Sequence, residues 1–300
     1  MDNKFNFSSK FKIANIFSII FFTVSVLFIL FKGLNYGIDF KGGTLIELRA
    51  SSTGASEIRT ALNKMDLGDV NVKNFGQEGD YLIKVEQKEN DGNKIIPQIK
   101  ENLSENLKTE INFRRVENVG PKVSSELLQS GIIAISLSLA AMLFYIWIRF
   151  EWQFSIGSII ALFHDVVITL GIFSVLSLEI NLSIIAAVLT IVGYSMNDTV
   201  VIYDRIRENL NKFNRLNIKE IADLSINDTL ARTIITSVTT LLALLSIFIL
   251  GGEILKGFSF AMILGVVIGT YSSIFVASPM LKFFKVTYKT LEKEEEKIVP

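Results

Sequence analysis

The sequence contains no cysteine and a single histidine, and these absences exclude several kinds of site. Without cysteine, the chain forms no disulfide, offers no thiolate nucleophile and holds no iron–sulfur cluster. One histidine, His164, rules out a metal centre built from several histidines. The 30 basic and 30 acidic residues cancel, so no overall positive field attracts nucleic acid.

Charge is scarce as well as balanced. Only 20% of the residues are charged, 50% are hydrophobic, and the mean hydropathy is +0.43. A soluble domain carries about 25% charged residues. This composition excludes an ordinary soluble enzyme, a coiled coil and a disordered chain.

Long apolar runs dominate the sequence. A helix needs about 20 apolar residues to cross a hydrocarbon layer roughly 30 Å thick. Backbone polar groups in lipid must be bonded within their own segment, so each run should be helical. Six windows meet the requirement: 13–31, 131–148, 154–178, 182–203, 233–250 and 258–281. The sequence therefore predicts an α-helical polytopic membrane protein with six transmembrane helices.

The first window has features of a signal peptide, because lysines precede an apolar run. The run is longer than a typical signal-peptide core, and no small-x-small cleavage site follows it. We therefore expect this window to remain as a membrane anchor.

The basic residues outside the spans predict the orientation. With a cytoplasmic N-terminus, the cytoplasmic segments carry fifteen Lys and Arg residues, whereas the short outer loops carry only Lys256. Cytoplasmic loops are enriched in these residues, so both termini should be cytoplasmic. The predicted divisions are the N-terminus and first span (1–31), a periplasmic domain (32–130), a five-helix membrane domain (131–284) with a cytoplasmic loop (204–232), and a cytoplasmic tail (285–300).

The hydrophilic insert between spans one and two has its own pattern of elements. Strands are expected at 43–49, 70–75, 80–86 and 109–116, and helices at 55–67, where Ser56 is the expected cap, and at 94–107. This βαββαβ order is that of a small α+β ferredoxin-like domain. The insert shows no nucleophile–base pair and no glycine-rich phosphate loop, so we expect a binding or mechanical role.

Asp198 is the first ionisable residue that falls inside a predicted span. It lies about 24 Å from the outer end of that span, and intramembrane charges are costly and usually functional. Ser195, Asn197 and Thr199 are expected to hydrogen-bond it, and Gly193 to admit a neighbouring helix. The alternative is a purely structural carboxylate that these neighbours cap.

Arg232 enters the membrane from the same side as Asp198, at the start of the fifth span. We expect the two to pair when Asp198 is charged and to separate when it is protonated. The alternative is an interfacial arginine that snorkels to the surface. The polar run that follows, with Thr236 and Thr239, could line a wet path or bond between helices.

His164 and Asp165 are adjacent near the middle of the third span. Histidine titrates near neutral pH and suits a proton shuttle. Adjacent helical residues point about 100° apart, so the two should not face one partner equally. A packed, hydrogen-bonded histidine is the alternative.

In the sixth span, Gly265 and Gly269 form a GxxxG motif, which is typical of closely packed helices.

Ordered motifs identify a family resemblance. Residues 37–44 (GIDFKGGT) and 119–122 (VGPK) flank the insert, and further motifs lie at 149–152, 161–165, 193–201, 204–209 and 232–240. Together these motifs resemble the SecD/SecF family of protein-export membrane proteins, in its SecF branch. The resemblance places six motif residues at the insert's borders: Gly37, Asp39, Gly42, Gly43, Gly120 and Pro121.

The resemblance implies a function in the bacterial inner membrane. The family belongs to the resistance-nodulation-division (RND) superfamily and assists the SecYEG channel together with SecD, with YajC and YidC as further partners. It implies proton-driven late-stage export of a polypeptide, with protons as the coupling ion, no other cofactor and no enzymatic activity. By motif, Asp198 and Arg232 would be the proton-responsive pair, and His164 and Asp165 belong to another matching motif.

The resulting hypothesis is that protonation of Asp198 frees Arg232, spans four and five shift, and span two relays the shift through Gly120 and Pro121.

Two alternative functions remain. A small-molecule efflux subunit of the same superfamily would need much larger outer domains. An intramembrane enzyme would need Asp165 and Asp198 close together as a carboxylate dyad.

Overall fold

The computed structural model describes residues 5–50, 53–65, 67, 70–74, 76–85, 92–107, 109–213 and 215–291. The predicted cytoplasmic tail lies outside the described residues from 292 on, as do Lys4, Lys293 and Lys297 of the orientation count.

Within this described part, six helical segments are long and apolar enough to cross a membrane. The first five are α1 (Phe11–Phe31), α5 (Pro121–Arg149), α6 (Trp152–Val175), α7 (Leu182–Lys212) and α8 (Ile218–Leu250). The sixth joins α9 (Gly252–Ser272), a π-helical turn η1 (Ser273–Ala277) and α10 (Ser278–Phe283). The prediction of a six-helix polytopic membrane protein is confirmed.

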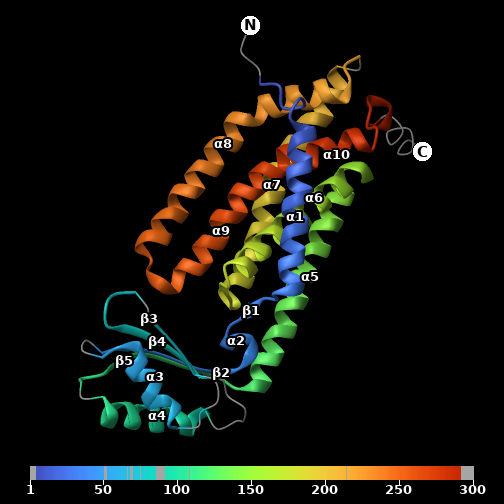
Figure 1. Cartoon of the computed structure of the whole chain (residues 1–300). Coiled ribbons are helices and arrows are strands. Elements are labelled where there is room, and N and C mark those ends of the chain that lie inside the picture. The colour runs from blue at the N-terminus through green and yellow to red at the C-terminus, as the bar shows by residue number, and fades with distance from the viewer. Residues whose placement is uncertain are drawn as a thin grey trace.

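The six segments form one bundle with a small domain at one end (Figure 1). Three segments form the interior, because 56% of the α6 window, 50% of the α7 window and 56% of the last window is buried. The other three lie at the periphery, with 11%, 11% and 17% buried for α1, α5 and α8. The buried polar side chains of these segments, such as Asp165 and Asp198, therefore face protein.

Residues 43–119 form the small domain. Its elements are β2 (Gly43–Arg49), α3 (Ala55–Asn63), β3 (Val70–Asn74), β4 (Asp80–Val85), α4 (Gly92–Asn106) and β5 (Asn112–Val119). The strands pair antiparallel in the order β3-β4-β2-β5. Alternate side chains such as Ile46, Leu48 and Ile83 pack with Ile58 and Leu103 of the two helices.

The predicted order of elements agrees with the observed one, but the predicted cap of α3 is wrong. Gly54 occupies the N-cap position with an extended backbone, and it supplies no side-chain cap. Ser56 lies inside the first turn, so its hydroxyl is past the position from which it could cap the helix.

Three short elements join the small domain to the bundle. β1 (Asn35–Tyr36) pairs in parallel with β6 (Glu179–Ile180), which connects α6 to α7. The four-residue helix α2 (Ile38–Lys41) follows β1 and leads into the sheet. We call β1, α2 and β6 the linker clamp. The sequence pattern did not predict β1, α2 or β6.

Candidate functional site in the helix core

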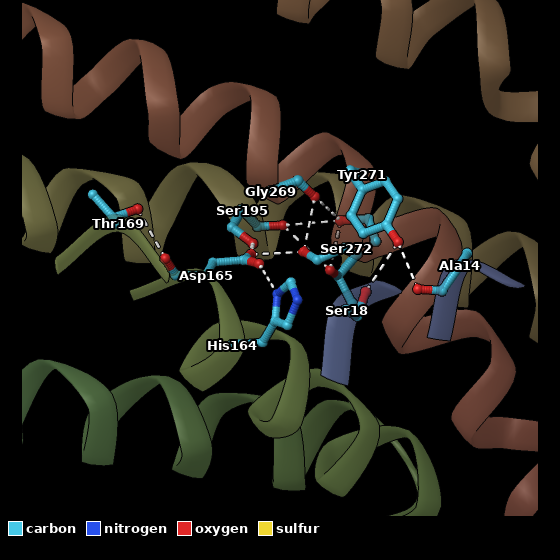
Figure 2. Close-up of polar contacts among 11 residues, drawn as sticks. Ala14, Ser18, His164, Asp165, Thr169, Ser195, Gly269, Tyr271 and Ser272 are labelled. Atoms are coloured by element: carbon cyan, nitrogen blue, oxygen red, sulfur yellow. Dashed lines mark hydrogen bonds and ion pairs between the residues drawn. The ribbon is translucent and has the colours of Figure 1, made fainter. Parts of the chain in front are cut away.

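Asp165 lies at the centre of a polar cluster that three helices share (Figure 2). Its side chain on α6 is fully buried, at 0% exposure. One carboxylate oxygen, Oδ2, accepts hydrogen bonds from Ser195 Oγ of α7 and Ser272 Oγ of α9, both at 2.6 Å. Buried charge is costly unless it is hydrogen-bonded, and the two hydroxyls supply that compensation.

His164 turns towards its own neighbour. Its Nδ1 lies 2.9 Å from Asp165 Oδ1, and its ring stacks on Phe22 of α1 with centroids 6.4 Å apart. The expectation that adjacent residues diverge did not predict this contact. The other ring nitrogen, Nε2, is buried and has no partner among the described residues. In a neutral ring that donates from Nδ1, Nε2 is a hydrogen-bond acceptor.

Asp198 lies one helical turn beyond Ser195 on α7 and is also buried, at 3% exposure. Its hydrogen-bond partner is Thr270 of α9, whose Oγ1 lies 3.4 Å from Asp198 Oδ2. Thr270 Oγ1 lies 2.7 Å from Ser237 Oγ of α8. A short polar chain therefore links the Asp198 carboxylate to α8.

The three residues expected to bond Asp198 lie elsewhere. Ser195 donates to Asp165 instead. The Thr199 hydroxyl lies 2.8 Å from that of Ser273. Asn197 is exposed on the far side of α7, because neighbouring helical positions point in different directions.

Arg232 lies within α8, and its side chain is exposed. Within the described residues, no ion pair joins it to Asp198. Thr236 and Thr239 do not belong to the polar cluster. Each hydroxyl donates a hydrogen bond to a backbone carbonyl of its own helix: Thr236 to that of Arg232, and Thr239 to that of Ile235. Of the polar run, Ser237 is the residue whose hydroxyl reaches α9.

Close contact between α7 and α9 depends on the GxxxG glycines. A Cβ on Gly269 would lie 2.9 Å from the Cβ of Ser195, and one on Gly265 would collide with Ile191. This agrees with the predicted close packing. The expectation for Gly193 is wrong, because a Cβ there would meet nothing within 4 Å.

Thr270, Ser272 and Ser273 belong to the cluster but were not predicted from the sequence. They form a polar patch in an otherwise apolar window, which was a usable signal. The helix then widens into η1, where Ser278 Oγ donates to the carbonyl of Ser273, five residues earlier. Such π-turns inside helices frequently occur at functional sites.

The motif residues of the insert's first border build the linker clamp. Asp39 Oδ2 accepts a hydrogen bond from the backbone N–H of Leu182, the first residue of α7, at 2.9 Å. Gly37 N–H donates to the Ile180 carbonyl at 2.8 Å. A Cβ on Gly37 would overlap the Glu179 side chain. The start of α7 is therefore held to the segment that enters the small domain.

The remaining motif residues meet at the second border. Gly43 pairs with Val119 in the sheet. Gly42 has a left-handed φ of 78°, and a Cβ there would lie 3.3 Å from the Val119 carbonyl and 3.4 Å from Pro121. Gly120 caps α5 and Pro121 is its first residue, a position that suits proline.

These features define a class: a polytopic helical membrane protein with carboxylates buried at a three-helix junction and a small α+β domain held to one end of the bundle. Residues 99–287 match the family model "Protein export membrane protein SecD/SecF, C-terminal", and residues 27–53 match "SecD/SecF GG Motif". The chain belongs to the SecD/SecF family.

Relatives and solved structures agree with this assignment. "Protein translocase subunit SecF" of Rickettsia bellii is 46% identical over 282 residues, 93% of each chain. That of Vibrio alginolyticus is 45% identical over 275 residues, 90% of this chain and 86% of the relative.

The crystal structure of Thermus SecDF, "a translocon-associated membrane protein", superposes with a TM-score of 0.85 at 34% identity and covers 95% of this chain. A super-membrane-facing form of SecDF gives a TM-score of 0.71 at 33% identity over 99% of this chain. The chain spans 39% and 40% of those SecDF chains.

Proposed function

We propose that this protein is the SecF-type subunit of a bacterial Sec translocase, which uses the proton-motive force with SecD to promote late-stage polypeptide export. The relatives named as SecF translocase subunits support the assignment. The match to SecDF structures supports SecD as its partner. SecYEG, YajC, YidC and the translocating polypeptide are the further partners in this proposal.

The proposed setting is the inner membrane, with both termini cytoplasmic and the small domain outside. The excess of Lys and Arg at one end of the bundle supports this orientation. We further assign the small domain to the ferredoxin-like class. Its sheet order, β3-β4-β2-β5, with both helices following the βαββαβ sequence, supports that assignment.

In the proposed cycle, Asp198 gains and loses the coupling proton. Asp165 has two serine donors and His164, whereas Asp198 has one distant threonine. The carboxylate with fewer donors is the one whose charge the core stabilises less. A neutral Asp198 no longer attracts the Thr270 hydroxyl strongly, which would loosen the polar chain to Ser237 on α8.

Movement of α7 would reach the small domain directly. The Asp39 carboxylate holds the first N–H of α7, and β6 immediately before it pairs with β1. This route adds to the relay through Gly120 and Pro121, since both borders of the small domain touch the bundle.

The energetics require several protons per movement. One proton that crosses 100 mV delivers about 2.3 kcal/mol. A nearly complete two-state switch needs about 5.5 kcal/mol. One proton driven by the voltage alone is therefore not enough. The switch would need more than two protons, or a pH gradient that adds to the voltage.

The proposal depends on one observation above all, the burial of the Asp198 carboxylate in the interior of the bundle. The test is Asp198→Asn, with Asn197→Ala as the matched control on the exposed side of the same turn. In inverted membrane vesicles with SecD, we expect Asp198→Asn to abolish proton-dependent stimulation of export and Asn197→Ala to keep it. Undiminished stimulation in Asp198→Asn, at equal protein level and SecD association, would refute the proposal.

A further inference from the structure

A cavity lies at the end of the bundle away from the small domain. It encloses about 480 Å³ between the end of α7, the start of α8 and the segment that follows α10. Lys282, Lys285 and Lys289 line it on one side, and Phe213, Leu216 and Tyr288 contribute apolar surface. The export cycle proposed above makes no use of this cavity.

Within the part of the chain that the structure describes, the residues that line the cavity carry only positive charge. No acidic residue is among its lining residues, and none of the three lysines has an ion-pair partner in the described part of the chain. Acidic groups on the adjacent helices are already engaged. Glu208 and Asp228 pair with Arg205, and Glu220 accepts from the backbone N–H of Asn217 at the cap of α8.

The lysines are held in place by a defined turn. The turn that follows α10 has Lys285 in the left-handed region, at a φ of 54°. Its N–H donates to the Lys282 carbonyl at 3.1 Å, and Val286 N–H donates to the Leu281 carbonyl at 3.0 Å. Leu281 and Val286 are buried, at 0% and 1% exposure. The turn reverses the chain, so that Lys289 returns to the same cavity as Lys282.

The apolar part of the cavity belongs to the membrane boundary. Phe213 and Leu216 are exposed at 40% and 41%, and Phe283 at the end of α10 is exposed at 76%. Tryptophan and tyrosine concentrate where the hydrocarbon meets the headgroups, and Tyr288 lines this cavity. A site that combines cations with exposed apolar surface at this level suits a molecule with an anionic head and acyl chains.

We infer that this cavity binds the headgroup of an anionic phospholipid, with the three lysines facing its phosphate. Basic pockets between transmembrane helices bind such headgroups. Inorganic phosphate shares the charge but would gain nothing from Phe213, Leu216 and Tyr288, so the lipid is the occupant that the lining favours. The inference does not depend on the role in export.

A natural reporter lies beside the cavity. The Trp152 ring is 5.6 Å from the Phe284 ring, and Phe284 precedes Lys285 in the turn. Trp147 is the other tryptophan. Trp147→Phe therefore leaves Trp152 as the single fluorophore, and brominated lipids quench tryptophan on contact.

The experiment titrates the full-length Trp147→Phe protein, in neutral detergent, with brominated phosphatidylglycerol or brominated phosphatidylcholine. We expect phosphatidylglycerol to quench at about tenfold lower mole fraction. Adding Lys282→Gln, Lys285→Gln and Lys289→Gln should remove that preference. The matched control, Lys10→Gln, Lys12→Gln and Lys219→Gln, removes the same charge from the same end of the bundle and should retain the preference.

Two results would overturn the inference. One is equal quenching by the two lipids, or a preference that survives the cavity substitutions. The other is complete release of phosphatidylglycerol by millimolar inorganic phosphate, which would identify a site for the free anion. Because all three lysines are exposed, their replacement should leave the fold intact, and size-exclusion elution at the wild-type volume checks this.

Discussion

At the scale of single residues, the two buried aspartates differ in how fully they are satisfied. Asp165 has donors from two other helices, which is the arrangement a permanently buried carboxylate requires. Asp198 has one long contact to Thr270. The sequence identified both residues as intramembrane charges, but it could not distinguish them, because their partners lie on other helices, 30 to 107 positions along the chain.

Lys84 offers a test of local electrostatics in the small domain. It lies on the sheet face that looks towards the bundle and contacts the Glu179 carboxylate of β6. Burial and the positive charge of Lys73 lower the pKa of Lys84 to about 8, from 10.5 for a free side chain, with Lys41 adding to the effect and Asp39 opposing it.

The sign of the pH dependence follows from these values. Between pH 8 and 10.5 the unfolded chain holds a proton on Lys84 that the folded domain has released, so stability rises with pH in this window. Below pH 8 both states are protonated and Lys84 contributes no slope. The full shift corresponds to about 3 kcal/mol, and partial exposure reduces this to roughly 1–2 kcal/mol.

We therefore expect wild type to gain roughly 1–2 kcal/mol over Lys84→Met between pH 7.5 and 10. Urea unfolding of the small domain in detergent, followed by circular dichroism, measures the difference. The exposed Lys64→Met serves as control and should track wild type. If wild type instead loses stability relative to Lys84→Met, the Glu179 contact dominates and the assigned pKa direction is wrong.

At the scale of elements, hydropathy predicted all six spans because a helix in lipid needs a continuous apolar run. Alternation predicted the strands of the small domain for a similar reason, since one sheet face packs on helices. Neither pattern says which helices are neighbours. The Ser195 contact with Asp165 and the parallel pairing of β1 with β6 depend on that tertiary choice, so sequence periodicity could not supply them.

The α7–α9 contact gives a matched pair of substitutions. A Cβ at Gly269 meets Ser195 at 2.9 Å, whereas a Cβ at Gly193 meets nothing within 4 Å. We expect Gly269→Ala to destabilise the bundle by about 1–3 kcal/mol through overpacking. Gly193→Ala should be neutral or stabilise it by up to about 1 kcal/mol, because alanine favours the helix.

Thermal unfolding of the two variants in the same detergent measures this contrast. Gly269→Ala should unfold at lower temperature than wild type, and Gly193→Ala should not. Equal midpoints for both variants would show that the two helices do not pack closely at Gly269.

At the scale of the whole molecule, the helices of the bundle divide into a buried interior set and an exposed outer set. α6, α7 and the last segment form its interior, whereas α1, α5 and α8 present apolar faces outward. The small domain is held at both of its borders, through Asp39 on α7 and through Gly42 against Pro121. A bundle attached in this way can transmit a shift of α7 to the small domain without a flexible joint between them.

The absence of cysteine makes the orientation directly measurable, because every introduced cysteine is the only one in the chain. Glu57→Cys places a thiol on an exposed position of α3 in the small domain, and Asn211→Cys places one at the opposite end, on the last turn of α7. The Lys and Arg residues that the structure describes at the Asn211 end, among them Arg205, Lys212 and Lys219, predict that this end faces the cytoplasm. In intact spheroplasts, an impermeant maleimide should label Glu57→Cys within minutes and leave Asn211→Cys unlabelled until the membrane is opened. Labelling in the reverse order would mean that the small domain is cytoplasmic, and a motor that pulls polypeptide from the outside would then be impossible for this chain.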